Sequence, residues 1–128
     1  MSKKGIHTDK APAAIGPYQQ GIRLGDLVFT SGQIALDPAT GNFMAGDIKQ
    51  ETELTLKNVE AILQAEGLTM DHVVKATVYL ADLNDFAEMN QVYEKSFASG
   101  KPARACVQVA ALPKGARVEI DVIAAANG

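Results

Sequence analysis

The chain has 128 residues, of which 47% are hydrophobic and 21% charged, and its 12 Lys and Arg against 15 Asp and Glu give a formal net charge of −3. A chain of this length buries roughly two thirds of its unfolded surface around one core, so we expect a single domain over residues 1–128. The negative charge and the lack of a basic block do not favour binding to a phosphate backbone. Nucleic acid is therefore not expected as the main partner.

Targeting signals, disulfides and metal sites are also not expected. The N-terminal segment has cations but no apolar run behind them, and no window approaches the roughly 20 apolar residues of a membrane span. We therefore expect a cytoplasmic protein with no membrane partner. The single cysteine, Cys106, excludes an internal disulfide, and His7 and His72 add no recognisable zinc spacing. No metal or other cofactor is expected.

The first predicted elements are two strands. Residues 19–24 and 27–32 flank Gly25-Asp26, a pair that suits a tight hairpin turn. We expect the chain to start with these two antiparallel strands. A cluster of turn-forming residues follows at 37–42.

A long helix is predicted next. Asp47, with Gln50 three residues later, resembles a capping box. Gly67 suits the position just after the end of the helix. Between them, apolar and small residues recur at helical spacing at Thr52, Leu56, Val59 and Leu63. The pattern is typical of an amphipathic helix of about five turns.

A strand, a second helix and two further strands complete the pattern. Residues 73–80 alternate, which places Val74, Ala76, Val78 and Leu80 on one side. Asp82 and Asp85 can cap a helix that stops at Gly100. The expected core stripe of this helix is Phe86, Met89, Tyr93 and Phe97. The last strands fall at 102–109 and 118–122.

The order ββαβαββ, with both helices amphipathic, predicts an α+β fold in which two helices pack on one face of a mostly antiparallel sheet. Arg104, Cys106 and Gln108 share one side of their strand, and Glu119 and Asp121 share one side of the last strand. If the aliphatic residues of both strands face the helices, these polar residues lie on the other, bare face. Such a face usually binds something or forms an oligomer. The pattern leaves open whether the two strands are adjacent.

Arg104 is the most unusual residue of these strands, because a permanent charge stands in a segment that otherwise looks buried. An unpaired buried charge costs several kcal/mol, so Arg104 requires an anionic partner. Two readings remain open at this point: the partner is a carboxylate at an interface, or it is a bound ligand.

Five segments together resemble the Rid family of reactive intermediate deaminases, RidA (YjgF-like) type. The segments are Ile15-Gly16-Pro17-Tyr18, Thr30-Ser31-Gly32-Gln33, Asp82-Leu83-Asn84-Asp85-Phe86 with Asn90, Pro102-Ala103-Arg104-Ala105-Cys106-Val107, and Leu112-Pro113-Lys114 followed by Val118-Glu119-Ile120. The resemblance implies a chorismate-mutase-like α+β fold with a mixed sheet, and a homotrimer with three ligand clefts between subunits.

The resemblance also implies an activity, that of a 2-iminobutanoate/2-iminopropanoate deaminase. Such an enzyme hydrolyses enamines and imines such as 2-aminoacrylate and 2-aminocrotonate to 2-keto acids and ammonia. Dehydratases that use pyridoxal phosphate release these intermediates, which implies a functional link to them. No cofactor is implied, since iminium ions hydrolyse readily without a metal or a covalent nucleophile.

Two residues are the implied catalytic pair. An imino acid carries a planar carboxylate, and the rigid fork of donors on Arg104 matches it in a bidentate fashion. Glu119, which matches the family's glutamate, can orient the attacking water and supply a proton to the departing nitrogen.

The remaining implied substrate-binding residues are Tyr18, Ser31, Gly32, Asn90, Ala105 and Cys106. Each has a structural alternative. Asn90 borders the buried stripe of its helix and can be a satisfied interface amide. A lone cysteine such as Cys106 is more often a small buried hydrophobe than a reactive thiol, so we interpret it as a pocket wall.

Two other functions stay open. A non-catalytic, regulatory trimer that binds small carboxylates such as 2-keto acids could use the same Arg104. A protein that acts on RNA, or a holdase, is disfavoured by the net charge and by the absence of an aromatic stacking platform.

Overall fold

The computed structural model describes residues 2–126. Its elements in chain order are β1 (Lys3–Ile6), β2 (Gly21–Leu24), β3 (Leu27–Thr30), α1 (Ile48–Gln64), β4 (Val73–Leu80), α2 (Phe86–Ser96), β5 (Ala103–Gln108) and β6 (Val118–Ala125). The strands form one six-stranded sheet in the order β1-β2-β3-β6-β4-β5. β4 and β5 are parallel, and all other neighbours are antiparallel.

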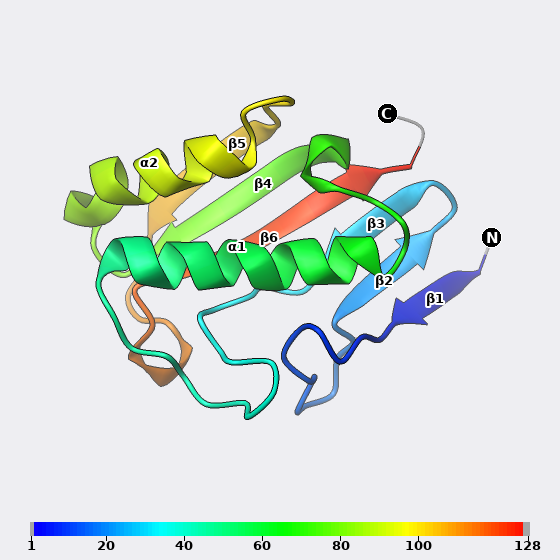
Figure 1. Cartoon of the computed structure of the whole chain (residues 1–128), viewed down its shortest axis with the longest axis horizontal. Helices are drawn as coiled ribbons and strands as arrows, with labels where there is room; N and C mark the ends of the chain where they lie inside the picture. Colours follow the sequence, from blue (N-terminus) through cyan, green and yellow to red (C-terminus); the bar gives the residue numbers. More distant parts are fainter. Residues whose placement is uncertain (1, 127–128) are drawn as a thin grey trace.

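Both helices lie on the same side of this sheet (Figure 1). The other face, which we call the open face, has no helix on it in this chain. The predicted α+β architecture, with two helices on one face of a mixed and mostly antiparallel sheet, is confirmed.

One strand was not predicted. The expectation that the chain starts with the hairpin of β2 and β3 is wrong, because β1 precedes it and pairs with β2 from Lys3↔Leu24 to Ile6↔Gly21. Three of the four residues of β1 are exposed, and Ile6 alone is buried. A strand at the sheet edge with one buried side chain shows no alternation that a sequence pattern could reveal.

Helix α1 begins and ends as predicted. The Asp47 carboxylate accepts a hydrogen bond from the Gln50 amide at 2.8 Å, and the Gln50 side chain accepts one from the Asp47 amide at 3.0 Å. Gly67 has a φ of +74°, which favours glycine. The predicted stripe is buried at Thr52, Leu56, Val59 and Leu63. Neither this helix nor any other within the described residues is long and apolar enough to cross a membrane.

The core lies between the helices and the sheet. Its sheet side consists largely of alternate residues of β4 and β6, which have little or no exposed surface: Ala76, Val78, Leu80, Val118, Ile120, Val122 and Ala124. On the helix side, Met89, Tyr93 and Phe97 of the predicted α2 stripe are also buried, whereas Phe86 is exposed. Burying each large aliphatic side chain contributes about 1.5–3 kcal/mol, so this layer holds β6 and β4 at the centre of the sheet.

The first part of β4 departs from the predicted alternation. Val73 is 5% exposed and Val74 45% exposed, whereas the pattern placed Val74 in the core. The β4–β6 register shifts between Val73 and Lys75, as at a β-bulge. A bulge adds one residue to a strand and so reverses the faces on one side of it.

The prediction of which sheet face carries the polar side chains of β5 is also wrong, and it decides where Arg104 lies. Arg104 was expected on the bare face, but it stands beside Ala76 in the parallel β4–β5 register and therefore faces the helices. Val107, of opposite parity, is 43% exposed. β5 is an edge strand that α2 covers only in part, so its polar residues rather than its aliphatic ones lie on the helix side.

Candidate functional site

The predicted site residues form two groups on opposite faces of the sheet. Glu119 points to the open face of β6, and Ser31 and Gly32 directly follow β3 beside it. Arg104 lies on the helix face of β5 with Asn90 of α2 and with Cys106. Within one chain, Arg104 and Glu119 are therefore separated by the sheet.

Two members of the first group, Gly32 and Glu119, line a pocket of about 160 Å³. Tyr18, Gly32 and Glu119 all contribute to its walls, and Lys114 lies there as well. Ser31 is not among the lining residues. Its hydroxyl donates to the backbone carbonyl of Gln19 at 2.5 Å, so it holds the segment that carries Tyr18.

Gly32 is packed directly against the carboxylate of Glu119. A Cβ atom at position 32 would overlap that carboxylate, so only glycine leaves room for it. Two backbone hydrogen bonds between Gln33 and Ile120, of 2.9 and 3.0 Å, hold the segment after β3 against β6. This backbone pairing fixes the position of Gly32 beside Glu119.

The carboxyl of Glu119 has an unusual environment. Burial raises its pKa, and the nearby charge of Asp121 raises the pKa further. Asp121 accepts a hydrogen bond from the hydroxyl of Tyr79 at 3.0 Å. Glu119 therefore holds a proton at higher pH than a solvated glutamate, which suits a group that must both give and accept protons.

The second group is organised around the guanidinium of Arg104. One of its nitrogens donates to the Asn90 side-chain oxygen at 2.5 Å. Its central carbon lies 4.7 Å from the ring centroid of Tyr93 and 5.3 Å from that of Phe86, within cation–π range. Asn90 in turn donates to Glu94 at 3.2 Å. The aromatic rings and the amide thus hold the guanidinium in one orientation.

The guanidinium borders a second pocket, of about 340 Å³, on the same side of the sheet. Its walls are Asn90, Tyr93, Glu94, Phe97, Lys101, Pro102 and Arg104. Across residues 2–126, the ion pairs do not include one to Arg104. Because Arg has five donor hydrogens and the bond to Asn90 occupies one, donors remain for an incoming carboxylate.

Cys106 and Ala105 differ in environment. Cys106 is partly buried against the core, and burial raises the pKa of its thiol although the charge of Arg104 opposes that effect. A thiol of raised pKa is a weak nucleophile, which favours the interpretation as a pocket wall. Ala105 is exposed and lies on the opposite side of β5 from Arg104.

Sequence reasoning missed three residues around Arg104 and Glu119. Tyr93 and Phe86 were assigned to a core stripe, yet their rings contact the guanidinium. Lys114 lies in the pocket of Glu119 with a φ of +58°. The signal for Lys114 was present in Leu112-Pro113-Lys114-Gly115, since Pro and Gly bracket a turn in which a non-glycine residue adopts this strained conformation.

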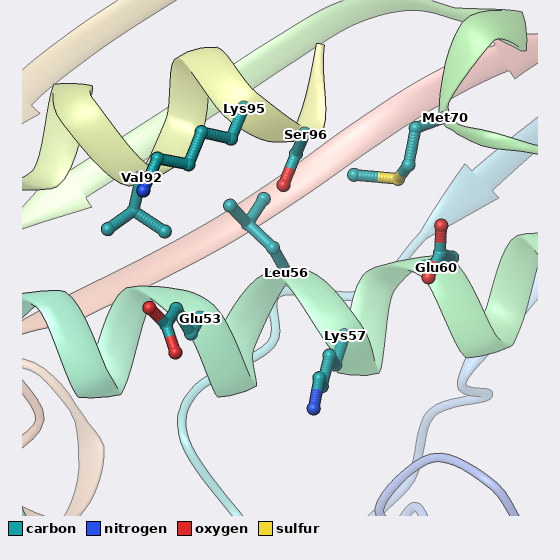
Figure 2. A pocket seen from close by; sticks show the side chains of 8 residues that line it. All are labelled: Glu53, Leu56, Lys57, Glu60, Met70, Val92, Lys95 and Ser96. Carbon is teal, nitrogen blue, oxygen red and sulfur yellow. The ribbon is translucent and has the colours of Figure 1, made fainter. Parts of the chain in front are cut away.

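A third pocket, of about 400 Å³, lies between α1 and α2. Figure 2 shows Leu56 pointing from α1 towards α2, with Val92 and Ser96 of α2 and Met70 around it. None of the predicted site residues lines this groove. Across residues 2–126, no three His, Cys, Asp or Glu side chains are grouped as metal ligands would be.

Comparisons with known proteins identify the family of the chain. Residues 8–126 match the model of a family described as Endoribonuclease L-PSP. The bovine 2-iminobutanoate/2-iminopropanoate deaminase is 52% identical over 124 residues, which cover 97% of this chain and 90% of the bovine protein.

Solved structures are similar over nearly the whole chain. A Rid family protein of Yersinia pestis superposes with a TM-score of 0.94 at 43% identity, covering 97% of this chain and 99% of that one. Escherichia coli TdcF, solved with bound serine, superposes with a TM-score of 0.91 at 50% identity, covering 95% and 98%. On the strength of these matches, which confirm the resemblance of the five sequence segments, the chain belongs to the Rid protein family.

Proposed function

We propose that the protein is an enamine/imine deaminase that converts 2-iminopropanoate and 2-iminobutanoate, with their enamine tautomers, to 2-keto acids and ammonia. The main observation is that the chain has both an oriented guanidinium at Arg104 and a half-buried carboxyl of raised pKa at Glu119. The name of the bovine relative supports the same activity.

Arg104 serves as the anchor for the substrate carboxylate. Its guanidinium is held by Asn90 and by the two aromatic rings, so little side-chain freedom remains to be lost on binding. A charge-assisted hydrogen bond is worth about 1.5–3 kcal/mol, which gives modest affinity. The larger benefit is to fix the imine carbon relative to the attacking water.

Glu119 serves as the proton shuttle. In its acid form it protonates the imine nitrogen, and as a carboxylate it takes a proton from the water that adds to the carbon. It then protonates the amine of the resulting carbinolamine. As the C–N bond breaks and ammonia leaves, the carbinolamine hydroxyl returns its proton to Glu119. Such general acid–base catalysis typically contributes about 10²–10⁴ in rate.

A site that uses both residues requires two chains, since one sheet separates Arg104 from Glu119. We therefore propose a homotrimer with one cleft between each pair of neighbours. One subunit contributes Tyr18, Gly32 and Glu119, and the next contributes Arg104 with Asn90 and Cys106. Exposed apolar residues of the strands, such as Val107, support an interface along the sheet.

Such a substrate comes from another enzyme. Enamines and imines of this kind are short-lived in water, so the class of reaction that supplies them is β-elimination from hydroxy amino acids by pyridoxal-phosphate dehydratases. We propose a functional link to such dehydratases in the cytoplasm, in which this protein shortens the lifetime of their released product.

A coupled assay tests the activity. A serine dehydratase generates 2-aminoacrylate, and ammonia or pyruvate release is followed with and without this protein. Faster release with the wild-type protein, strongly reduced in both Arg104→Ala and Glu119→Gln, is the expected result. If the wild-type protein does not accelerate release, the proposed deaminase activity is wrong.

A second candidate function is binding of small carboxylates without turnover. The solved structure of TdcF contains serine, which shows that a similar protein holds an amino acid. Calorimetry with 2-keto acids separates the two functions. A pure binder shows Arg104-dependent binding and no effect of Glu119→Gln on any reaction.

A ribonuclease activity has less support, although the matching family carries that description. Asp121 lies two residues from Glu119 on the same side of β6, and two neighbouring carboxyl groups do not favour a phosphate backbone. Cleavage of RNA by highly purified protein, lost in Arg104→Ala, would reverse this ranking.

A further inference from the structure

The hydrogen-bonded pair of Tyr79 and Asp121 neither gives nor accepts a proton in the proposed reaction. The pair lies on the open face, where Tyr79 of β4 and Glu119 of β6 are direct partners in the strand register. Yet the hydroxyl of Tyr79 does not bond to Glu119. It donates to Asp121, two residues further along the same side of β6, at 3.0 Å.

This choice of partner has an electrostatic consequence. Because Tyr79 donates to Asp121, its hydrogen bond stabilises the ionised form of Asp121 and opposes the effect of burial on that residue. Glu119 is left with a negative neighbour and with no hydrogen bond from the tyrosine that faces it. Its proton is therefore retained more strongly than burial alone would cause.

The other groups around Glu119 do not reverse the increase in its proton affinity that Asp121 causes. Tyr18 lies in the loop before β2, and Gly32 carries no side chain. Lys114, from the 3₁₀ turn at Pro113–Gly115, is the cation among the lining residues and acts in the opposite direction. Asp121 is the anion that raises the proton affinity of Glu119, and Tyr79 is its hydrogen-bond donor.

We propose that Asp121, held by Tyr79, is a positioning residue whose charge sets the proton occupancy of Glu119 during turnover. The inference rests on the proposed deaminase function in so far as it concerns turnover. Asp121 is not among the residues that line the pocket of Glu119, and in this proposal it acts only through Glu119. A shuttle that both gives and accepts a proton works best when both of its forms are populated, which a solvated glutamate does not achieve near neutral pH.

Carboxyl ¹³C NMR on the intact protein provides a test that does not depend on activity. The signal of Glu119 is assigned by its loss in Glu119→Gln and followed against pH. In Asp121→Asn, which keeps an oxygen for Tyr79 but removes the charge, the Glu119 midpoint is expected to move to lower pH. An unchanged midpoint would overturn the proposal.

Two variants separate charge from structure. Thr77→Val alters the residue paired with Asp121 in the register without changing charge, so the Glu119 midpoint is expected to stay at its wild-type pH. Tyr79→Phe removes the hydrogen bond that keeps Asp121 ionised, so the midpoint is expected to move downward, by less than in Asp121→Asn. If the midpoint of Glu119 shifts as much in Thr77→Val as in Asp121→Asn, the shift is not a charge effect. If Asp121→Asn does not fold, Tyr79→Phe provides the test.

The pH dependence of kcat/KM in the coupled assay tests the role in turnover. In Asp121→Asn, the part of the profile that follows protonation of Glu119 is expected to move to lower pH with the NMR midpoint. A shift in the NMR titration without one in the profile would contradict the role in turnover. Absence of any activity in the wild type would instead contradict the deaminase proposal, and the NMR titration would still decide the coupling.

Discussion

Arg104 shows how one side chain can be both immobilised and available. Asn90 takes one of its donors, and the rings of Tyr93 and Phe86 lie within cation–π range of the guanidinium, so further donors remain for a bidentate partner. A lysine at this position would keep the charge but lose the fork and much of the stacking.

Two substitutions of Arg104 are therefore expected to reduce catalysis to different extents. Arg104→Ala should lower kcat/KM by roughly 10- to 150-fold, the equivalent of one charge-assisted hydrogen bond, and Arg104→Lys should lower it less. Lys101→Ala, which removes another cation from the same pocket, is the matched control and should retain activity. Equal losses in Arg104→Ala and Lys101→Ala would contradict a specific clamp.

Gly32 is required because the Glu119 carboxylate occupies the space that a side chain would take. Gly32→Ala should displace that carboxylate and abolish most of the activity while leaving the fold intact. Gly100→Ala, at a glycine with only ordinary contacts around a Cβ, is the control and should behave as wild type. Steady-state kinetics together with circular dichroism distinguish the outcomes, and an active Gly32→Ala would contradict the assigned position of Glu119.

The raised pKa of Glu119 should also make the stability of the folded protein depend on pH. Its pKa is raised in the folded state, so its contribution is fully present below the unfolded pKa of about 4.3 and is lost as pH rises through the folded value. Glu119→Gln removes this titration. The difference in Tm, variant minus wild type, should therefore be larger at pH 7 than at pH 4. The same Tm difference at both pH values would contradict a raised pKa.

At the scale of elements, the two helices begin with aspartates that act differently. Asp47 accepts a hydrogen bond from the first turn of α1, whereas Asp85 makes no such bond at α2. Asp47→Ala should cost about 1 kcal/mol in the free energy of unfolding, and Asp85→Ala should cost much less. Denaturant unfolding measures both free energies. A cost for Asp47→Ala as small as that for Asp85→Ala would show that the capping box adds nothing to the stability of α1.

The elements that the sequence predicted well are those whose signals are local. The capping box and stripe of α1 depend on residues within one helix, so Asp47, Gln50 and Gly67 could be read directly. The faces of β4 and β5 depend on partners elsewhere in the chain. A bulge displaced Val74, and the edge position of β5 turned Arg104 towards α2, and neither feature leaves a trace in a two-residue alternation.

The same distinction applies to the site. Gly32 and Glu119 were found through motifs and lie together, because the pairing of Gln33 with Ile120 joins their segments. The contacts of Tyr93 and Phe86 with Arg104 were not foreseen, since helical spacing alone cannot tell a core aromatic from one that stacks on a cation. The separation of Arg104 from Glu119 required the register of β4, β5 and β6.

At the scale of the whole molecule, the two half-sites on opposite faces are the central feature. If Arg104 is the substrate anchor and Glu119 the proton shuttle, as proposed, a single chain has each of them without the other. In the proposed homotrimer, Arg104 of one chain would meet Glu119 of the next, because every interface in a ring of identical subunits joins the same two surfaces. The open face, with its mixed apolar and acidic residues, would then be covered in part by neighbouring chains.

Mixing of two impaired variants tests this account most directly. Arg104→Ala and Glu119→Gln are each expected to form trimers, confirmed by light scattering, and to have strongly reduced deaminase activity. After unfolding and refolding together in equal amounts, mixed trimers should contain intact sites, and random assembly should restore about a quarter of the wild-type activity per site. Mixed trimers that form but remain as impaired as the two variants would contradict a site shared between subunits.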